Sequence, residues 1–302
     1  MGADFIPIHT LARPRLPEWL RHPHTHHESV VSLKRDLRAH RLHTVCESAR
    51  CPNIHECFHR GTATFMILGN LCTRGCAFCA VPKSRRPPPP DPDEPSAVAR
   101  MAAAMGLRYV VITSVNRDDL PDGGAGHFAA TIRQLRRALP LARIEVLTPD
   151  FRGRLEDVRT VLDAAPDVFN HNMETVEPLY PRVRPQADYR QSLRVLVEAK
   201  RYRPAGLTKS GLMVGLGETP AQVEQLLRDL LQAQVDIVTI GQYLQPTRRN
   251  LPVAEYVTPA QFDSYRQTAL RMGFRAAFSG PLVRSSYLAE QVSRAAIQEP
   301  RG

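Results

Sequence analysis

The 302-residue sequence lacks several features, and each absence excludes a class of protein. No hydrophobic run approaches the roughly 20 residues that a membrane-spanning helix needs, so we expect no membrane partner. The N-terminus lacks the apolar core of a secretory signal peptide, and Asp4 and Glu18 are atypical of an import peptide. We therefore expect a cytoplasmic protein.

Acidic residues are too few to balance the basic ones. The chain has 30 Asp and Glu against 40 Lys and Arg, which gives a net charge of +10. Such a charge favours an acidic partner. Aromatic residues make up only 6% of the chain, and no basic stripe is interleaved with them. Because nucleic-acid motifs are missing as well, we expect no nucleic-acid partner.

Cysteine is absent from most of the chain. All six cysteines fall into two groups of three, namely Cys46, Cys51 and Cys57, then Cys72, Cys76 and Cys79. A reducing cytoplasm disfavours three disulfides, so metal or redox chemistry is the leading interpretation. Thiolates bind zinc or iron–sulfur clusters, but structural zinc takes four protein ligands. Three thiolates on one tight loop can hold three irons of a [4Fe–4S] cube and leave the fourth iron open.

The N-terminal part of the chain shows little regular pattern. We expect residues 1–28 to be irregular, and we interpret the His-rich stretch 21–27 as a solvated extension rather than a metal site. From Ser29 the apolar spacing predicts a short amphipathic helix. The proline-rich stretch 85–96 cannot be a helix or an inner strand. It predicts a stiff connector that ends in Ser96 as a helix N-cap.

Beyond this connector the pattern becomes regular. Strands are predicted at 64–68, 109–115, 143–148, 167–171, 209–215 and 236–242, and helices at 97–105, 127–139, 154–165, 188–202, 220–234 and 259–272. Gly106 and Gly273 follow two of the helices, at the position where a glycine in the left-handed conformation commonly ends a helix. Six β-then-α units imply parallel strands with helices outside, either as a partial barrel or as an open sheet. Eight units would close a full barrel.

We therefore predict an α/β fold, a partial (β/α)6 TIM-like barrel at residues 61–280. An N-terminal extension, 1–60, precedes it, and a C-terminal tail, 281–302, carries a short helix. Polar motifs follow each predicted strand, from "CTRGCAFC" after the first to "QYLQPT" after the sixth. Because barrels and open α/β sheets build their sites at the C-terminal ends of strands, we expect the functional site there.

The second cysteine group resembles that of the radical S-adenosylmethionine superfamily. Its spacing is Cys-x3-Cys-x2-Cys on the loop after the first strand, with aromatic Phe78 before the last cysteine, and "GLMVGLGE" at 211–218 looks like the superfamily's fifth-strand motif. The resemblance implies a [4Fe–4S] cluster on Cys72, Cys76 and Cys79 that binds S-adenosylmethionine and generates a 5′-deoxyadenosyl radical. It also implies that the 211–218 motif, with Gly215 and Gly217, lines the adenine. Asn172 and Glu174 end the fourth predicted strand, where they either bind the ribose or methionyl amine or cap the loop. Phe78 and Thr113 complete the predicted contacts to S-adenosylmethionine.

The first cysteine group, spaced Cys-x4-Cys-x5-Cys, resembles that of the lipoyl synthase family in particular. So do "RSSYLA" at 284–289, "TSVNRDDLPDGGAGHF" at 113–128 and "RPQADYRQSL" at 184–193. The resemblance implies an auxiliary [4Fe–4S] cluster on Cys46, Cys51 and Cys57, with a serine of the RSSY motif as fourth ligand. We choose Ser285, next to Arg284, over Ser286, and assign both Arg284 and Ser285 catalytic roles. Softness alone would not select serine as an iron ligand.

The same resemblance implies an activity and a set of partners. The auxiliary cluster is consumed as the sulfur source, and two C–S bonds form at the sixth and eighth carbons of a protein-bound octanoyl chain. Each lipoyl group takes two molecules of S-adenosylmethionine. The implied partners are octanoylated lipoyl carrier domains, namely 2-oxoacid dehydrogenase E2 subunits and the glycine cleavage H protein. A flavodoxin or ferredoxin reductant and an iron–sulfur assembly carrier complete the set.

Some residues and some functions keep alternative interpretations. His55 and Phe58 depart from the usual Gly and Trp of the family, and neither is a predicted cluster ligand. His55 either bears on access to the cluster or is a surface variant, and we favour the surface variant. Residues 117–119 are either a solvated charge cluster or a salt-bridge set. Arg182 and Arg184 either anchor a carboxylate or are exposed. The alternative functions are a biotin synthase-like enzyme, a methylthiotransferase, and a non-catalytic zinc module that binds nucleic acid.

Overall fold

A computed structural model describes residues 16–21, 27–48, 51–59 and 64–298. Most of the His-rich stretch therefore lies outside the described residues. One eight-stranded sheet runs in the order β1 to β8. The strands are β1 (His43–Thr44), β2 (Thr64–Ile67), β3 (Tyr109–Ser114), β4 (Arg143–Leu147), β5 (Val168–Asn170), β6 (Leu207–Val214), β7 (Ile237–Gln242) and β8 (Ala276–Gly280). Every neighbouring pair from β2 to β8 is parallel, and β1 is antiparallel to β2.

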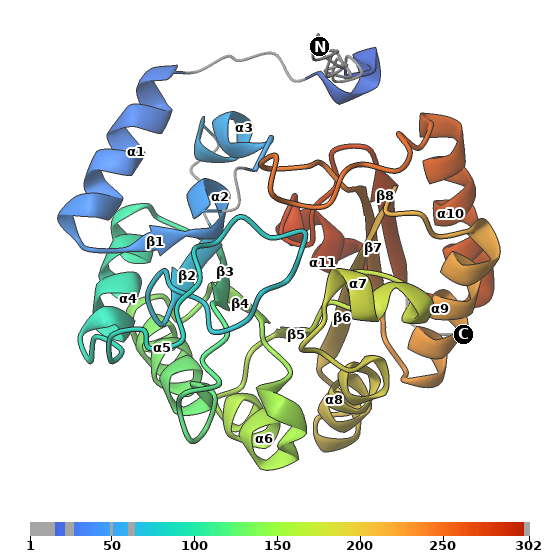
Figure 1. Cartoon of the computed structure of the whole chain (residues 1–302). Helices are drawn as coiled ribbons and strands as arrows, with labels where there is room; N and C mark the ends of the chain where they lie inside the picture. Colours follow the sequence, from blue (N-terminus) through green and yellow to red (C-terminus); the bar gives the residue numbers. More distant parts are fainter. Residues whose placement is uncertain (1–15, 22–26, 49–50, 60–63, 299–302) are drawn as a thin grey trace, which may run out of the picture.

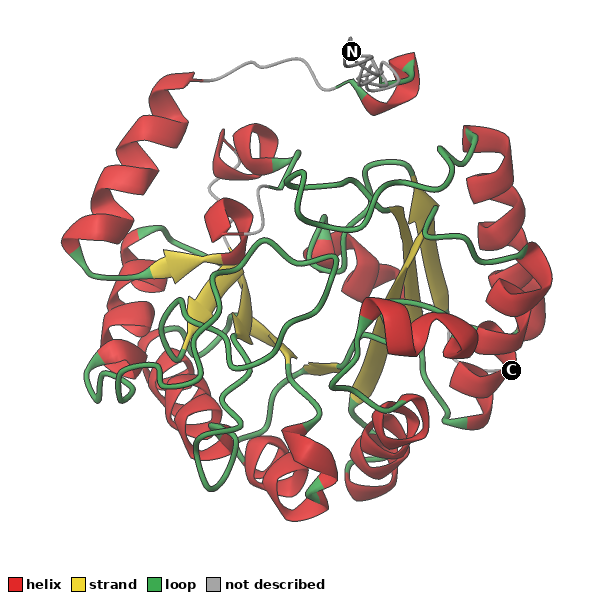
Figure 2. Cartoon of the chain, viewed as in Figure 1, coloured by secondary structure: helices red, strands yellow, loops and turns green. Residues whose placement is uncertain are grey.

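Helices alternate with the strands, and most of the long ones lie outside the curved sheet (Figures 1 and 2). They are α1 (His27–Ala39), α2 (Val45–Ser48), α3 (Ile54–His59), α4 (Glu94–Ala104), α5 (Ala125–Ala138), α6 (Leu155–Asp163), α7 (Tyr180–Val183), α8 (Tyr189–Tyr202), α9 (Pro220–Gln232), α10 (Pro259–Met272) and α11 (Ala289–Gln298). Short 3-10 turns are η1 (Glu18–Leu20), η2 (Phe151–Gly153) and η3 (Glu177–Leu179). No helix of the described residues is long and apolar enough to cross a membrane.

The sheet curves into a barrel that stays open between β1 and β8, which confirms the predicted partial-barrel class. The six predicted strands are β2 to β7. Two further strands were not predicted. β8 reads Ala-Ala-Phe-Ser-Gly and has none of the β-branched residues that mark a strand. β1 has only two residues, too few for any period.

The C-terminal helix α11 packs across the N-terminal end of the barrel. Its buried Val292 and Ala296 form one apolar cluster with the first residues of four strands, Val168, Leu207, Ile237 and Ala276. In Figure 1, α11 lies behind the strands, inside the ring of outer helices. The opposite end of the barrel, where the C-terminal ends of the strands lie, is therefore available for a functional site.

One predicted helix boundary is wrong. Helix α4 begins at Glu94, with Asp93 at the N-cap position and Pro95 in the first turn, so Ser96 is not the cap. The Ser96 hydroxyl donates to the Asp93 carbonyl instead, at 2.9 Å. The earlier start follows from the tolerance of a first helical turn for proline. Gly106 and Gly273 have φ of 61° and 108°, so both predicted left-handed positions after helices are confirmed.

Candidate functional site

The loop after β2 carries the second cysteine group in a compact turn. Cys72 donates its N–H to the Pro82 carbonyl at 2.9 Å, and Cys79 donates to the Cys76 carbonyl at 3.2 Å. The N–H of Arg74 points at Cys72 Sγ, 3.4 Å away. Cys72 is buried, and Cys76 and Cys79 are half-buried. The backbone hydrogen bonds thus hold the three thiols on one short turn.

These thiols influence one another electrostatically. The pKa of Cys79 is raised to about 11, mainly by burial and also by the neighbouring Cys76 and Cys72. Burial also raises the pKa of Cys76, which Arg184 and Arg74 partly oppose. Because a bound metal takes thiolates, loading this group must release protons.

The first cysteine group lies on α2, α3 and the turn between them. Cys51 donates its N–H to the Cys46 carbonyl at 3.0 Å, and Cys57 donates to the Asn53 carbonyl at 2.9 Å. Burial raises the pKa of Cys46 to about 12, and Cys51 adds to the rise. His55 is half-buried on α3, whereas the side chain of Phe58 lies outside the described part of the chain.

The C-terminal segment before α11 closes over this first group. Asn53 Nδ2 donates to the Leu282 carbonyl at 2.7 Å, and the Tyr287 hydroxyl donates to Glu56 at 3.0 Å. Gly241 at the end of β7 makes the approach possible, because a Cβ there would fall on the Val283 carbonyl oxygen. The segment thereby brings Arg284 beside Cys51, where its charge opposes the burial that raises the pKa of the thiol.

A single cavity of about 350 Å³ is bordered by residues of both cysteine groups and of the RSSY motif. The residues predicted from the sequence that border this cavity are Cys46, Cys51, Phe78, Cys79, Asn172, Glu174, Arg284 and Ser285, and Ser286 also borders it. Apolar walls come from residues such as Leu147, Leu212 and Met213. Asn172 Nδ2 donates to Ser285 Oγ and to Glu174 Oε1, both at 3.0 Å. The structure therefore joins segments that are far apart in the sequence around one apolar volume.

Other predicted residues do not border this cavity. Thr113 donates its hydroxyl to the Leu147 carbonyl at 3.0 Å inside the sheet. Gly215 packs against Gln242 and the Glu255 carbonyl, and Gly217 is next to Ala254. Cys57 borders a second cavity, of about 290 Å³, together with residues around Tyr109 and Tyr287. The contacts of Thr113, Gly215 and Gly217 with S-adenosylmethionine stay predictions.

Arg184 is a buried cation in this region, whereas Arg182 is exposed. Its Nη1 donates to the carbonyls of Asn172 and Met173 at 3.0 and 3.1 Å. Its Nε has no hydrogen-bond partner, and no ion pair joins it to any described carboxylate. Burial raises the pKa of Glu174, and Arg184 opposes that rise. Because a buried cation that forms no direct ion pair with a described carboxylate is costly, Arg184 fits an anionic ligand.

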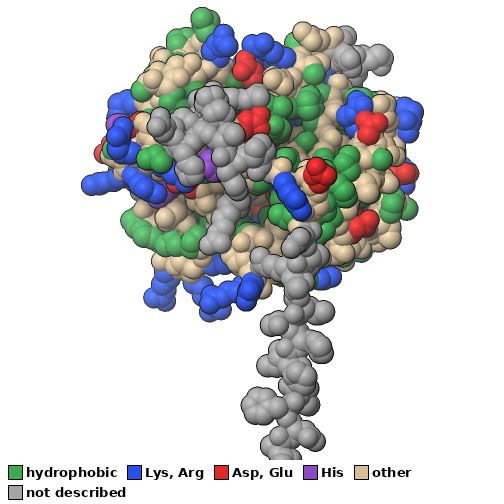
Figure 3. Space-filling view, turned by 90° about the horizontal axis from the view of Figure 1, so that it is seen from above, with side chains coloured by type: hydrophobic (Ala, Val, Ile, Leu, Met, Phe, Trp, Pro, Cys, Tyr) green, Lys and Arg blue, Asp and Glu red, His purple; other side chains and the backbone are tan. Residues whose placement is uncertain are grey.

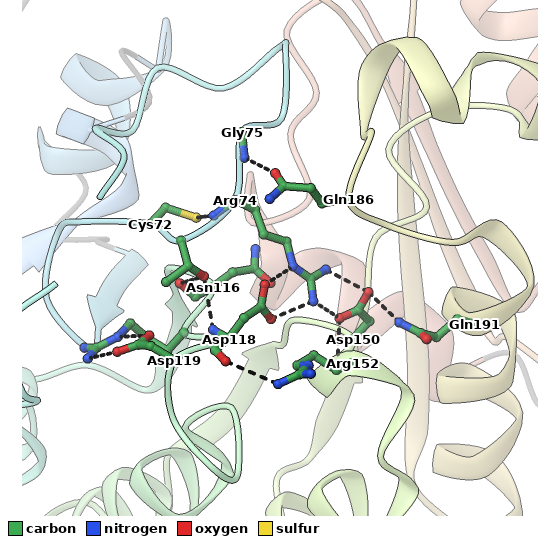
Figure 4. Close-up of polar contacts among 12 residues, drawn as sticks. Cys72, Arg74, Gly75, Asn116, Asp118, Asp119, Asp150, Arg152, Gln186 and Gln191 are labelled. Atoms are coloured by element: carbon green, nitrogen blue, oxygen red, sulfur yellow. Dashed lines mark hydrogen bonds and ion pairs between the residues drawn. The ribbon is translucent and has the colours of Figure 1, made fainter. Parts of the chain in front are cut away.

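Arg74, inside the cysteine loop, forms a buried network that sequence reasoning missed (Figure 4). Its guanidinium contacts both carboxylate oxygens of Asp118 at 2.6 and 2.8 Å, and both of Asp150 at 2.8 and 2.7 Å. Burial would raise the pKa of Asp150, but Arg74 holds it well below its usual range. The available signal was an arginine between two cysteines. Arg117 pairs with Asp119 at 2.8 Å, so residues 117–119 belong to a salt-bridge set.

The donor sets of both groups fit iron–sulfur clusters. Soft thiolates suit the irons of a cluster, and each group offers three of them. Among the described residues, no three His, Cys, Asp or Glu side chains are grouped for a single metal ion. A cube differs from such an ion because each thiolate is bound to a different iron.

Known proteins resemble this chain over nearly its whole length. A model of the radical SAM superfamily matches residues 66–230, and a model of the N-terminal domain of lipoyl synthase matches residues 6–51. The lipoyl synthase of Azoarcus sp. (strain BH72) is 55% identical over 297 residues, 96% of this chain and 94% of that protein. The lipoyl synthase of Rubrobacter xylanophilus is 56% identical over 275 residues, 91% and 85% of the two chains.

Solved structures share the fold at low sequence identity. The [FeFe]-hydrogenase maturase HydG has a TM-score of 0.54 at 14% identity, over 67% of this chain and 47% of that one. Streptococcus suis SuiB bound to S-adenosylmethionine has a TM-score of 0.53 at 10% identity, over 73% and 50%. The chain thus spans about half the length of these two structures. The superfamily match implies one [4Fe–4S] cluster and S-adenosylmethionine. The chain belongs to the lipoyl synthase family of radical S-adenosylmethionine enzymes.

Proposed function

We propose that this enzyme builds the lipoyl group by inserting sulfur at the sixth and eighth carbons of an octanoyl chain, and that a second cluster supplies the sulfur. Family membership makes an octanoylated carrier protein the substrate class. The observation that supports the proposal is the cavity that Cys46 and Cys51 share with Cys79 and Ser285. A radical source and a sulfur source that border one volume can act on the same alkyl chain.

Cys72, Cys76 and Cys79 are the proposed ligands of the first cluster. When bound there, the cluster and S-adenosylmethionine would together supply radical chemistry able to activate an unactivated C–H bond. The protein supplies position and excludes water. Arg184 is the proposed partner of the methionyl carboxylate, because it is buried beside Cys76 and Glu174 and its Nε is unpaired.

Asn172 and Glu174 are proposed to bind the amine or ribose of S-adenosylmethionine. Both border the cavity, and Gly211 lets Asn172 approach β6, since a Cβ there would lie 2.9 Å from Asn172 Oδ1. Phe78, Thr113, Gly215 and Gly217 complete the proposed set of contacts. The apolar walls of the cavity are proposed to exclude water from the reacting carbons.

Cys46, Cys51, Cys57 and Ser285 are the proposed ligands of the second cluster. Asn172 donates to Ser285 Oγ at 3.0 Å and so fixes the direction of that oxygen. Arg284, beside Cys51, can offset the negative charge of bound thiolates. An oxygen ligand holds iron less firmly than a thiolate does, which suits a cluster that must give up sulfur.

The proposed partners follow from this chemistry. The carriers are octanoylated lipoyl domains of 2-oxoacid dehydrogenase E2 subunits and the glycine cleavage H protein. A flavodoxin or ferredoxin delivers electrons, and an iron–sulfur assembly carrier rebuilds the second cluster. We place the reaction in the cytoplasm, where reducing conditions keep the six thiols available as ligands.

Anaerobic reconstitution followed by an octanoyl-carrier assay tests the proposal. We expect about eight irons per chain, as two cubes require, and a mass gain of two sulfurs on the carrier in the presence of S-adenosylmethionine and a reductant. A colourless protein that holds zinc would support the zinc module instead. Two clusters without any sulfur gain on the octanoyl carrier would favour a biotin synthase-like or methylthiotransferase reaction.

A further inference from the structure

We propose that Arg74 is a positioning residue of the radical site, which holds the cysteine loop in its ligand-presenting conformation and sets the charge beside the cluster through Asp118 and Asp150. The proposal rests on the assignment of Cys72, Cys76 and Cys79 as ligands of the first cluster. Arg74 itself is not among the proposed ligands and does not border the cavity.

The geometry uses the whole guanidinium group. Asp118 follows β3 and Asp150 follows β4, and Arg74 makes a two-pronged contact with each carboxylate. Figure 4 shows the guanidinium between the two carboxylates. Arg74 is 4% exposed and Asp150 is fully buried. Such paired contacts require the planar fork of arginine, which the single ammonium of lysine cannot reproduce.

Further contacts extend the network to α8 and to the turn before it. Gly75 donates its N–H to Gln186 Oε1 at 2.5 Å, and Gln191 Nε2 donates to Asp150 at 3.0 Å. The backbone between Cys72 and Cys76 is therefore fastened to the ends of three successive βα units. This fastening also aims the Arg74 N–H at Cys72 Sγ, 3.4 Å away. Hydrogen bonds to sulfur and local charge are both known determinants of cluster potential.

Charge arithmetic predicts effects of opposite sign. Arg74 contributes one positive charge and the two aspartates contribute two negative charges. Replacing Arg74 with Gln removes the positive charge and should lower the reduction potential of the cluster. Replacing Asp150 with Asn removes a negative charge and should raise it. Arg74→Lys keeps the charge and loses the fork, so its potential should stay closer to the parent than that of Arg74→Gln.

The experiment uses a parent in which Cys46, Cys51 and Cys57 are replaced by Ala, so that only the radical cluster assembles. Arg74→Lys, Arg74→Gln and Asp150→Asn are made in this parent and in the intact chain. Arg136→Lys serves as the matched control. Arg136 forms an ion pair with Asp167, with 2.9 Å between nitrogen and oxygen, and this pair does not involve the cysteine loop. The readouts are iron affinity against a chelator, the potential from a redox titration, and hydrogen exchange of residues 72–79 without iron.

We expect iron affinity to fall about 10- to 100-fold in the Arg74 variants, as for other residues that orient metal ligands. We also expect faster exchange of the loop, opposite shifts of potential for Arg74→Gln and Asp150→Asn, and no change for Arg136→Lys. Equal potentials and unchanged loop exchange in all variants would overturn the positioning role. A parent that binds no four-iron cluster would instead overturn the assignment of the three cysteines.

Discussion

Cys76 and Cys51 differ in their neighbours, and this difference separates two kinds of variant. Arg184 and Arg74 face Cys76, whereas Arg284 faces Cys51. We expect Cys76→Ala to abolish cleavage of S-adenosylmethionine, because the proposed radical cluster would lose a thiolate. Cys51→Ala should still cleave S-adenosylmethionine, at a reduced level, but should form no C–S bond. The measurement is 5′-deoxyadenosine and thiolated product side by side, and substantial 5′-deoxyadenosine from Cys76→Ala would contradict the assignment.

Ser285 and Ser286 offer a matched pair of variants. Only Ser285 accepts the hydrogen bond from Asn172, at 3.0 Å, although both serines border the cavity. We expect Ser285→Ala to behave like Cys51→Ala, with cleavage retained and sulfur insertion lost, and Ser286→Ala to stay near the unmodified enzyme. Normal lipoyl formation by Ser285→Ala, with a defect in Ser286→Ala, would assign the oxygen ligand to the other serine.

We expect His171 to make the stability of the fold depend on pH. Burial lowers its pKa to about 4, with Arg184 adding to the effect. Between pH 6.5 and about 4, the unfolded chain binds a proton on this histidine and the folded chain does not. The free energy of unfolding should therefore fall as the pH falls through this window, by about 3 kcal/mol in total.

His171→Asn removes this titration and keeps a donor for the Thr148 carbonyl, which His171 Nδ1 contacts at 2.9 Å. Urea unfolding of the iron-free protein at several pH values between 7.5 and 4 measures the difference. The variant should show a flatter pH dependence than the natural chain. Equal slopes for the two proteins would show that His171 is not the group that titrates.

At the scale of elements, the close approach of the C-terminal segment to β7 depends on Gly241. Gly241→Ala would place a methyl group on the Val283 carbonyl, so the segment that carries Arg284 and Ser285 must move away. We expect loss of sulfur insertion, with cleavage of S-adenosylmethionine affected less. Gly206→Ala is a milder comparison, because its added Cβ would make only a tight contact, at 3.3 Å, with the Arg203 carbonyl oxygen. Equal sulfur insertion by both variants would show that the close contact is unimportant.

The regular elements were predictable because their signals are local. The β2 to β7 strands and the helices between them follow from runs of apolar and β-branched residues. β8 escaped prediction because its Ala and Gly residues are placed by neighbours in the sheet rather than by their own preference. The start of α4 was missed for a similar reason. Buried Glu94 accepts the Leu68 N–H at 2.7 Å, a contact that no local pattern contains.

The candidate site was only partly predictable. Spacing singled out the six cysteines, because each group of three lies within one short segment. The RSSY motif was assigned only through its resemblance to the family. The partners of Arg74 were not found, since Asp118 and Asp150 lie 44 and 76 positions further along the chain. The cavity that joins Cys46 to Cys79 and Ser285 likewise depends on the closure of the sheet. Such contacts arise from topology, and a single sequence carries no local sign of them.

The whole molecule carries a net charge of +10, which bears on its encounter with a carrier. Figure 3 shows Lys and Arg side chains in several places on the face seen from above. Exposed Arg248 and Arg249 follow Gln245 and Pro246, which border the cavity. Surface charges mainly set the rate of encounter and are screened by salt. The association rate with an octanoylated carrier should therefore fall several-fold between about 0.05 and about 0.5 M salt.

Reversing the charges beside the cavity tests whether these particular arginines guide the carrier to it. Arg248→Glu with Arg249→Glu should slow association and weaken its salt dependence. Arg137→Glu, an exposed change on α5, should have a smaller effect. Stopped-flow fluorescence with a labelled carrier measures both rates. A rate that stays flat with salt, or equal effects of the two reversals, would rule out charge-guided docking beside the cavity.

The bonds from Asn53 to Leu282 and from Glu56 to Tyr287 span 229 and 231 positions. A ribosome makes the first partner of each bond long before the second. The radical-site loop can find Asp118, Asp150 and Gln186 while translation is still under way, because all three emerge well before the C-terminal segment. The first cysteine group gains these two contacts only after residues 282–287 have been made. We therefore expect the long-range contacts around the first cysteine group to form later during synthesis than those around the second group.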